Sequence, residues 1–230
     1  MPPEAVSSRP GAVLLDVDGT LVDTAYLHTV CWWQALRGQG HTVAMAEIHR
    51  SVGMGSDQLL DHVLGDDRDR GGDESLVSAH DVGFSGWYDR VVPLPGARDL
   101  VHECSRRGLL VVLASSGSAR DLKAMRAALD SDEHIAAATT SADAEASKPA
   151  PDILAVALDR ARVTSEYAVF VGDAVWDVEA SRRVGLDCIG LECGGTSAAE
   201  LVAAGAVETW RDPADLLANL DRSAVSRLLG

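Results

Sequence analysis

The sequence predicts an α/β fold, with a three-layer α/β/α core built on a parallel sheet and a helical domain inserted after the first strand. Short apolar runs alternate with helical segments in the later part of the chain, as in βαβ units. The first apolar run, Gly11–Leu15, leads directly into two aspartates. Residues 23–92 show helical spacing and no convincing strand. We therefore expect an α/β core of residues 1–22 and 93–230 and a helical cap of residues 23–92.

Composition limits the classes of function. The chain has 230 residues, enough for one large domain or a medium core with an insertion. Its formal net charge of -15 would repel a phosphate backbone, so we expect no nucleic-acid partner. No apolar run approaches the ~18 residues that a membrane span needs, and we expect no membrane association.

The cysteines and the first residues indicate the compartment. The four cysteines form no CxxC pair and are expected to be free thiols in a reducing environment. Residues 1–10 lack the apolar core of a signal peptide and are expected to form a loose tail. We expect a cytoplasmic protein that is a monomer or a weak homodimer.

The first strand carries the central pair of polar residues. Asp16 and Asp18 stand two positions apart at the end of an extended segment, so their side chains leave on the same face. In open α/β sheets, ligands bind at the carboxyl ends of the strands. Two close carboxylates repel each other unless a cation or a shared proton intervenes. The pair therefore predicts a metal, an acid/base pair, or both.

The inserted segment is expected to be wholly helical. Asp23 or Thr24 is a plausible N-cap for its first helix. The expected helices cover Ala25–Leu36, Ala44–Val52, Ser56–Leu64 and Glu74–Arg90. The segment from Asp23 to Val92 holds eleven acidic residues and five arginines, a poor environment for a substrate with a second strong anion. Arg50 lies beside a candidate specificity loop at residues 51–56, or is simply a helix-end arginine facing water.

The core resumes after a proline-rich turn at residues 93–96, where helices and strands alternate. Helices are expected at Ala97–Arg107, Ala119–Leu129, Asp152–Ala161, Trp176–Val184, Ala198–Ala204 and from Ala214 onward. Strands are expected at Leu109–Ala114, Ile135–Ala138, Tyr167–Val171, Asp187–Leu191 and near Val207.

Three further polar groups follow these elements. Ser115, Ser116 and Gly117 end one strand where a helix begins, which suits an anion seat or a simple N-cap. Asp173 ends another strand and can reach Asp16, although a turn role is the alternative.

Lys148 precedes a helix that starts with proline. It is either a solvated surface charge or the cation that a crevice of carboxylates requires. Asp177 lies in a first helical turn, where an acid is favoured for structural reasons alone.

Together, four motifs in order resemble the haloacid dehalogenase (HAD) superfamily of phosphotransferases over essentially the full chain. They are Asp16-Val17-Asp18-Gly19-Thr20, Ser115 after a buried strand, Lys148-Pro149, and Gly172-Asp173 with Asp177. The helical insertion resembles the small cap of the β-phosphoglucomutase and phosphoglycolate phosphatase branch, as do Asp23-Thr24, His28 and Trp32. The resemblance implies a HAD-like, Rossmann-type core.

The resemblance also implies roles. Asp16 is the expected nucleophile, and Asp18 the general acid and then base. Ser115 and Lys148 would hold the transferring phosphoryl oxygens. Mg²⁺ would bind Asp16, Asp173 and the backbone carbonyl of Asp18.

An acid at Asp18 favours phosphoryl transfer over carbon–halogen cleavage, because only an alcohol leaving group needs a proton. His28 is a candidate contact to the phosphoryl site, with packing as the alternative. We expect a Mg²⁺-dependent phosphatase acting on a small phosphorylated metabolite. The alternatives are a phosphomutase, which the lack of basic residues between Val52 and Ser56 disfavours, and a non-catalytic binding domain of the same fold.

Overall fold

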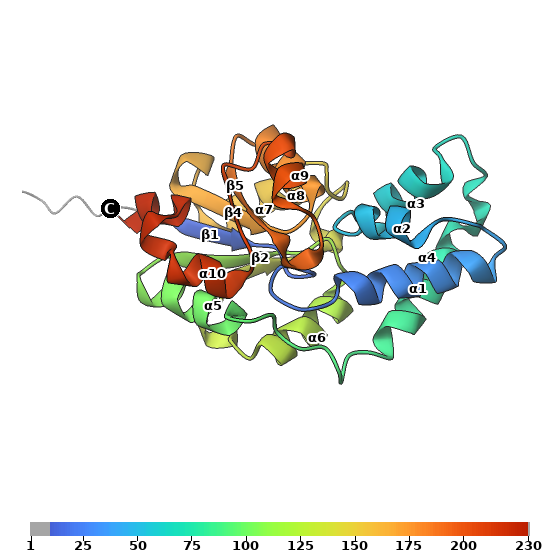
Figure 1. Ribbon diagram of the computed structural model, residues 1–230, viewed down its shortest axis with the longest axis horizontal. Helices are drawn as coiled ribbons and strands as arrows, with labels where there is room; N and C mark the ends of the chain where they lie inside the picture. The colour runs from blue at the N-terminus through green and yellow to red at the C-terminus, as the bar shows by residue number, and fades with distance from the viewer. Residues whose placement is uncertain (1–9, 230) are drawn as a thin grey trace, which may run out of the picture.

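The core is a six-stranded, fully parallel sheet in the order β3-β2-β1-β4-β5-β6 (Figure 1), which confirms the predicted α/β class. The computed structural model describes residues 10–229, so nearly all of the expected N-terminal tail lies outside the described residues. The strands are β1 (Ala12–Leu15), β2 (Leu110–Ala114), β3 (Ala137–Thr139), β4 (Ala168–Gly172), β5 (Asp187–Leu191) and β6 (Glu208–Trp210). The strand order reverses between β1 and β4, and such switch points are where α/β sheets bind ligands.

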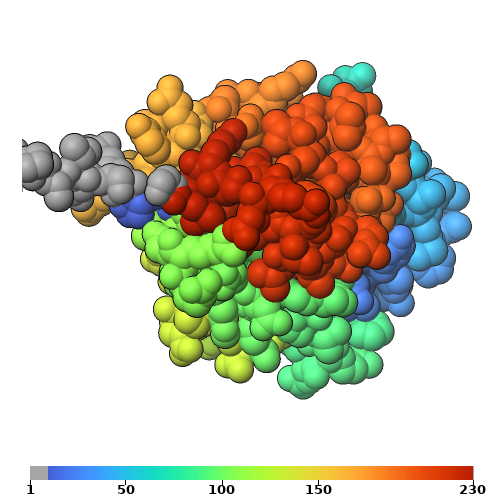
Figure 2. All heavy atoms as spheres, turned by 60° about the vertical axis from the view of Figure 1, so that its left-hand side comes forward, coloured from blue at the N-terminus to red at the C-terminus, as the bar shows by residue number. Residues whose placement is uncertain are grey.

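Helices cover both faces of the sheet because the strands are apolar on both sides. Val13 and Leu15 join one buried cluster with α5 (Ala97–Arg106), α6 (Ala119–Leu129) and α10 (Pro213–Ala218). Ala12 and Leu14 join the opposite cluster with α7 (Asp152–Ala161), α8 (Val175–Arg183) and α9 (Ala198–Ala204). The C-terminal segments, red in Figure 2, close one end of the core against the green region that contains α5.

The inserted segment forms a separate helical unit beyond the carboxyl ends of the strands (Figure 1). Its helices are α1 (Ala25–Gly38), α2 (Met45–Ser51), α3 (Ser56–Leu64) and α4 (Asp73–Ser85). Trp32, Leu36 and Ile48 belong to a third buried cluster, which is confined to this unit. The two connections to the core run side by side, because the Asp23 N–H donates to the Val92 carbonyl at 3.0 Å.

Some element boundaries differ from the sequence-based expectation. Helix α4 ends at Ser85 rather than Arg90, because the Trp87 N–H turns back to the Phe84 carbonyl at 2.9 Å. Strand β3 begins two residues later than expected, after a 3₁₀ turn at Asp132–His134. Helix α6 begins at Ala119 and is capped by Ser118, not by Ser115 or Ser116.

No helix among residues 10–229 is both long and apolar enough to cross a membrane. The cysteines are free thiols; Cys31, Cys104 and Cys188 are buried, and Cys193 is partly buried beside the Gly19 carbonyl.

Candidate active site

A buried ion cluster lies at the switch point between β1 and β4. Lys148 Nζ donates to Asp16 Oδ1 at 2.5 Å and to Asp177 Oδ1 at 2.7 Å, and the lysine is fully buried. Burial disfavours the charged amine, but Asp16 and Asp177 outweigh it and raise the pKa of Lys148. Lys148 is therefore a buried cation rather than a solvated surface charge.

Asp173 completes this cluster from the end of β4. The Thr20 hydroxyl donates to Asp173 Oδ1 at 2.8 Å, and two glycines make room for the carboxylate. A Cβ on Gly19, which has φ +81°, would lie 2.6 Å from Asp173 Oδ2, and one on Gly194 would lie 1.7 Å from it. We call Asp16, Lys148, Asp173 and Asp177 the floor of the site.

The floor suits a divalent cation. Asp16, Asp173 and Asp177 each offer an oxygen, and these oxygens lie within 4.8 Å of one another. Both Asp177 oxygens are engaged, by Lys148 and by the Ala174 N–H at 3.0 Å. Asp16 Oδ2 is buried without a hydrogen-bond partner among the described residues. An unpartnered carboxylate oxygen beside a second acid is the all-oxygen environment that Mg²⁺ prefers.

Burial also perturbs the floor acids. It raises the pKa of Asp16 to about 7, against the attraction of Lys148, and the neighbouring Asp177 and Asp18 add to the rise. Burial, followed by Asp177 and Asp16, raises the pKa of Asp173 well above its ordinary value. A cation next to these oxygens would favour their charged forms, because an opposite charge lowers the pKa of an acid.

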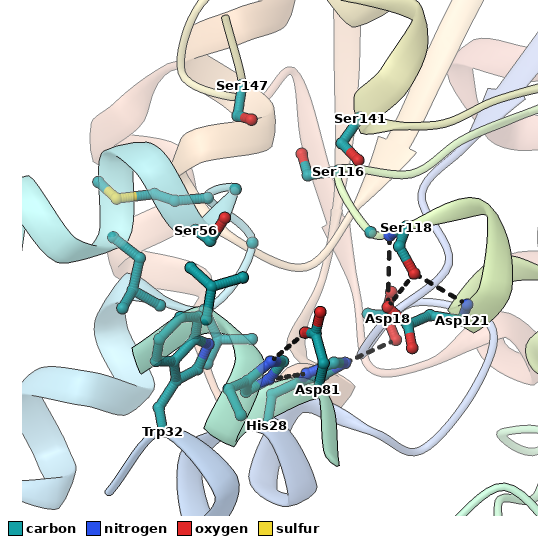
Figure 3. Close-up of a pocket in the computed structure, with 18 of the residues that line it drawn as sticks. Asp18, His28, Trp32, Ser56, Asp81, Ser116, Ser118, Asp121, Ser141 and Ser147 are labelled. Carbon is teal, nitrogen blue, oxygen red and sulfur yellow. Dashed lines mark hydrogen bonds and ion pairs between the residues drawn. The ribbon is translucent and has the colours of Figure 1, made fainter. Parts of the chain in front are cut away.

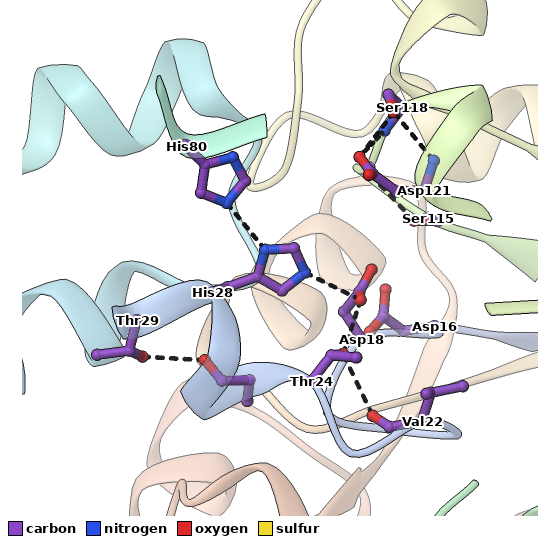
Figure 4. A network of polar contacts seen from close by, with 12 residues as sticks. Asp16, Asp18, Val22, Thr24, His28, Thr29, His80, Ser115, Ser118 and Asp121 are labelled. Carbon is purple, nitrogen blue, oxygen red and sulfur yellow. Dashed lines mark hydrogen bonds and ion pairs between the residues drawn. The ribbon is translucent and has the colours of Figure 1, made fainter. Parts of the chain in front are cut away.

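A chain of hydrogen bonds leads from Asp18 into the helical unit (Figure 4). Asp18 Oδ1 accepts from the Thr24 hydroxyl at 2.7 Å and lies 3.1 Å from His28 Nε2. His28 Nδ1 lies 3.0 Å from His80 Nε2, and His80 Nδ1 lies 2.9 Å from Asp81 Oδ1. The chain thus joins α1 and α4 to the end of β1.

This chain fixes where protons reside. The carboxylate of Asp81 accepts from His80 Nδ1, and burial lowers the pKa of His80, so this ring is neutral and its Nε2 accepts from His28 Nδ1. One proton must then lie between His28 Nε2 and Asp18 Oδ1. Burial would raise the pKa of Asp18, but His28 and Thr24 together lower it.

A cavity of about 190 Å³ lies between the floor and the helical unit (Figure 3). Asp16, Asp18 and the serines Ser116 and Ser118 line its core side. We call the opposite side, contributed by the helical unit, the wall. The wall consists of His28, Trp32, Val52, Gly53, Met54, Gly55, Ser56, Leu59, Val77, His80 and Asp81.

The two candidate serines differ in their contacts. Ser115 is buried, and its hydroxyl accepts from the Gly117 N–H at 3.0 Å. Ser116 Oγ lines the cavity and has no hydrogen-bond partner among residues 10–229. Ser116 therefore presents an unpartnered hydroxyl to the cavity, whereas the Gly117 N–H is already bonded to Ser115. Anion binding by these three residues stays a prediction.

Arg50 does not reach the cavity. Its guanidinium pairs with Glu200 of the core helix α9 at 3.0 Å, and the side chain is 68% exposed. Its backbone carbonyl accepts from Trp176 Nε1 at 2.7 Å, so this segment joins α2 to the start of α8. Arg50 therefore does not line this cavity, and its expected contact with substrate stays a prediction.

Sequence reasoning missed several residues of the site. His80 and Asp81 carried no signal, because a helical pattern does not show that His80 meets His28, 52 positions earlier. The Thr20 and Thr24 hydroxyls bind the two carboxylates, although the sequence suggested only a motif position and an N-cap. Gly194 also belongs to the site, because it packs against the Asp173 carboxylate.

Comparisons with known proteins agree with this geometry. A phosphoglycolate phosphatase of Pseudomonas putida is 26% identical over 192 residues, covering 80% of this chain and 70% of that protein. Protein SUPPRESSOR OF QUENCHING 1 of Arabidopsis thaliana, a chloroplastic protein, is 29% identical over 191 residues. That match covers 80% of this chain but 18% of the Arabidopsis protein, so the chain spans only a small part of this relative.

A solved structure is closely similar. The crystal structure of a hydrolase from Pseudomonas syringae has a TM-score of 0.89 and 30% identity, over 93% of this chain and 99% of that chain. A model of the haloacid dehalogenase-like hydrolases matches residues 10–185. The Pseudomonas putida relative falls in the branch that the helical insertion, with Asp23-Thr24, His28 and Trp32, indicates. The chain belongs to the haloacid dehalogenase-like hydrolases.

Proposed function

We propose that the protein is a Mg²⁺-dependent phosphatase that hydrolyses a small phosphorylated metabolite through an aspartyl-phosphate on Asp16. The observation that carries this proposal is the unpartnered Asp16 Oδ2, held beside a buried lysine and facing the same cavity as Asp18. Relatives named phosphoglycolate phosphatases support a small phosphate monoester as the substrate.

In the first half-reaction, a carboxylate oxygen of Asp16 attacks phosphorus, and the bond from phosphorus to the substrate's alcohol oxygen breaks. Asp18 delivers to that oxygen the proton held between Asp18 and His28. The products of this step are the free alcohol and the aspartyl-phosphate. The hydrogen bond from Thr24 orients Asp18 during the transfer.

In the second half-reaction, water attacks the phosphorus of the aspartyl-phosphate while Asp18 or its partner His28 takes the water proton. The bond between phosphorus and Asp16 breaks, which releases inorganic phosphate and restores the carboxylate. The same pair thus acts first as acid and then as base, and no net proton stays on it.

Positive charge and donors at the floor hold the phosphoryl group. Lys148 offsets the charge on Asp16, and the unpartnered Ser116 hydroxyl lines the cavity where phosphoryl oxygens would lie. Asp16, Asp173 and the Asp18 carbonyl would hold Mg²⁺, which supplies charge to offset the phosphoryl oxygens. Asp177 positions Lys148.

We propose that residues 23–92 act as a cap that excludes water from the reaction. Two glycines allow its loop to approach the core closely. A Cβ on Gly53 would lie 2.8 Å from Ala174 Cβ, and one on Gly55 would lie 1.9 Å from Ser147 Oγ. A phosphomutase would need a seat for a second phosphate, and the described lining of the cavity contains no arginine or lysine.

The test uses p-nitrophenyl phosphate with Mg²⁺ or with EDTA. Wild type should turn over only with the metal, and Asp16→Asn should lose more than about 1,000-fold in kcat because it removes the nucleophile. Asp159→Asn, on the exposed side of α7, is the matched control and should match wild type. Metal-dependent turnover that persists in Asp16→Asn would disprove the mechanism.

A further inference from the structure

The cavity wall has an unusual charge for an enzyme that must admit a phosphate dianion. Asp81 and Asp121 both line the cavity, and its described lining contains no arginine or lysine. Burial lowers the pKa of His80, so this wall residue supplies no positive charge. Among the described residues, the favourable charge for the phosphoryl group therefore comes from the floor, and Asp81 makes the wall acidic.

Asp81 on the wall and Asp121 on the core side of the cavity are not equally available. Asp121 is buried, accepts from the Tyr88 hydroxyl at 2.6 Å and from the Ser118 hydroxyl at 2.6 Å, and completes the capping box of α6. Asp81 Oδ1 accepts only from His80, and the Asp81 side chain is 47% exposed. Asp81 therefore has free acceptor capacity that faces the cavity, as Figure 3 shows.

The position of Asp81 is fixed relative to the reacting end. Three hydrogen bonds of 2.9 to 3.1 Å run from Asp81 through His80 and His28 to Asp18, which serves the leaving oxygen. The cavity holds about 190 Å³, only somewhat more than the ~150 Å³ cavity that accommodates benzene and below the usual range for drug-sized ligands. Asp18 and Asp81 both line this cavity, so a leaving group of a few carbon atoms would lie between them.

We propose that the substrate is the phosphate monoester of a short amino alcohol, whose ammonium group pairs with Asp81. This inference rests on the proposed phosphatase function and names its substrate class. The apolar side chains Trp32, Leu59 and Val77 contact the short carbon chain, and the Asp81 carboxylate accepts hydrogen bonds from the ammonium group. A carboxylate in the same place would meet Asp81 and Asp121 without a compensating cation, which selects against phosphorylated acids.

The experiment compares three probes of similar size: phosphoethanolamine, ethyl phosphate and 2-phosphoglycolate, which end in an ammonium, a methyl and a carboxylate. We expect kcat/KM to fall in that order, by roughly tenfold at each step. Asp81→Asn keeps the size of the side chain and should reduce the preference for ammonium over methyl by about tenfold. Asp66→Asn removes an exposed charge elsewhere in the cap and should leave the order unchanged.

The outcomes separate the two proposals. If p-nitrophenyl phosphate is hydrolysed but ethyl phosphate or 2-phosphoglycolate exceeds phosphoethanolamine, the substrate class is wrong and the phosphatase function stands. An unchanged preference in Asp81→Asn would likewise overturn the assignment of Asp81. If none of the four esters is hydrolysed with Mg²⁺, the phosphatase function itself fails.

Discussion

The floor and the wall of the cavity differ in how their polar groups are satisfied. On the floor, Lys148 is fully enclosed and shared between Asp16 and Asp177, so each charge depends on the others. On the wall, Asp81 is half exposed and bonded to one neighbour, and the rest of the surface is largely apolar. We therefore expect substitutions on the floor to change both the reaction and the stability, and substitutions on the wall to change the preferred substrate at little cost to the fold.

The substitution with the largest expected effect is Lys148→Met, on the floor. It would leave Asp16 and Asp177 buried without a cation, and we expect a loss of roughly 3–5 kcal/mol in the free energy of unfolding together with loss of activity. Urea denaturation followed by circular dichroism measures the change. Lys123→Met alters the other lysine of the chain, which is exposed on α6, and should keep the wild-type midpoint. Equal urea midpoints for both variants would contradict the claim that the buried charges of the floor depend on Lys148.

The floor also predicts a pH dependence in EDTA. Folding raises the pKa of Asp16 from its ordinary value of 3.8 to about 7. Between these values the folded state retains a proton that the unfolded state releases, so stability falls as pH rises from about 4 to 7. We expect Tm to drop by several degrees over this interval. Added Mg²⁺ should raise Tm more at pH 8 than at pH 5.5.

Asp16→Asn provides the control for this titration, because the amide cannot ionise. Its Tm in EDTA should change less steeply with pH than that of wild type. The same slope in both proteins would show that other groups account for the pH dependence.

A milder effect is expected from substituting His80, the wall residue that is hydrogen-bonded to His28. His80→Phe keeps an aromatic ring against Trp32, whose ring centroid lies 4.3 Å away, but removes the partner of His28 Nδ1. We expect kcat for p-nitrophenyl phosphate to fall about tenfold, the effect of losing one ordinary hydrogen bond, with little change in KM. His41→Phe, elsewhere in the cap, is the control. A rise in KM without a fall in kcat would place His80 in substrate binding instead.

The smallest effect is expected at the ion pair that joins α2 of the cap to α9 of the core. Arg50 and Glu200 form an ion pair whose side chains are 68% and 41% exposed, and such pairs contribute little. We expect Arg50→Ala to keep kcat/KM within about twofold of wild type. A larger loss of kcat/KM would show that Arg50 contributes to substrate binding or catalysis.

The sequence was sufficient to predict the strands of the sheet and the residues that form the floor. Continuous apolar runs located five of the six strands within a residue or two, and the polar residues after them converge because parallel strands end on one edge. The end of α4 was missed because Trp87 and Tyr88 continue the helical pattern while their side chains pack on the core.

The wall was harder to predict than the floor. Its contacts depend on how α1 and α4 face each other, and the sequence gives only the apolar stripe of each helix. His80 and Asp81 therefore looked like ordinary helix residues. The direction of the Arg50 side chain depends on Glu200, 150 positions later, and local spacing carries no information about that contact.

The position of β1 has a consequence for synthesis on the ribosome. This strand precedes both of its neighbours in the sheet, since β2 begins at Leu110 and β4 at Ala168. The emerging β1 must stay unpaired until those later segments leave the exit tunnel, because its ladder partners do not yet exist. Asp16, Lys148 and Asp173 can meet only at that stage. Nascent chains that stop before β4 would therefore expose an apolar strand and would need chaperone protection rather than show partial activity.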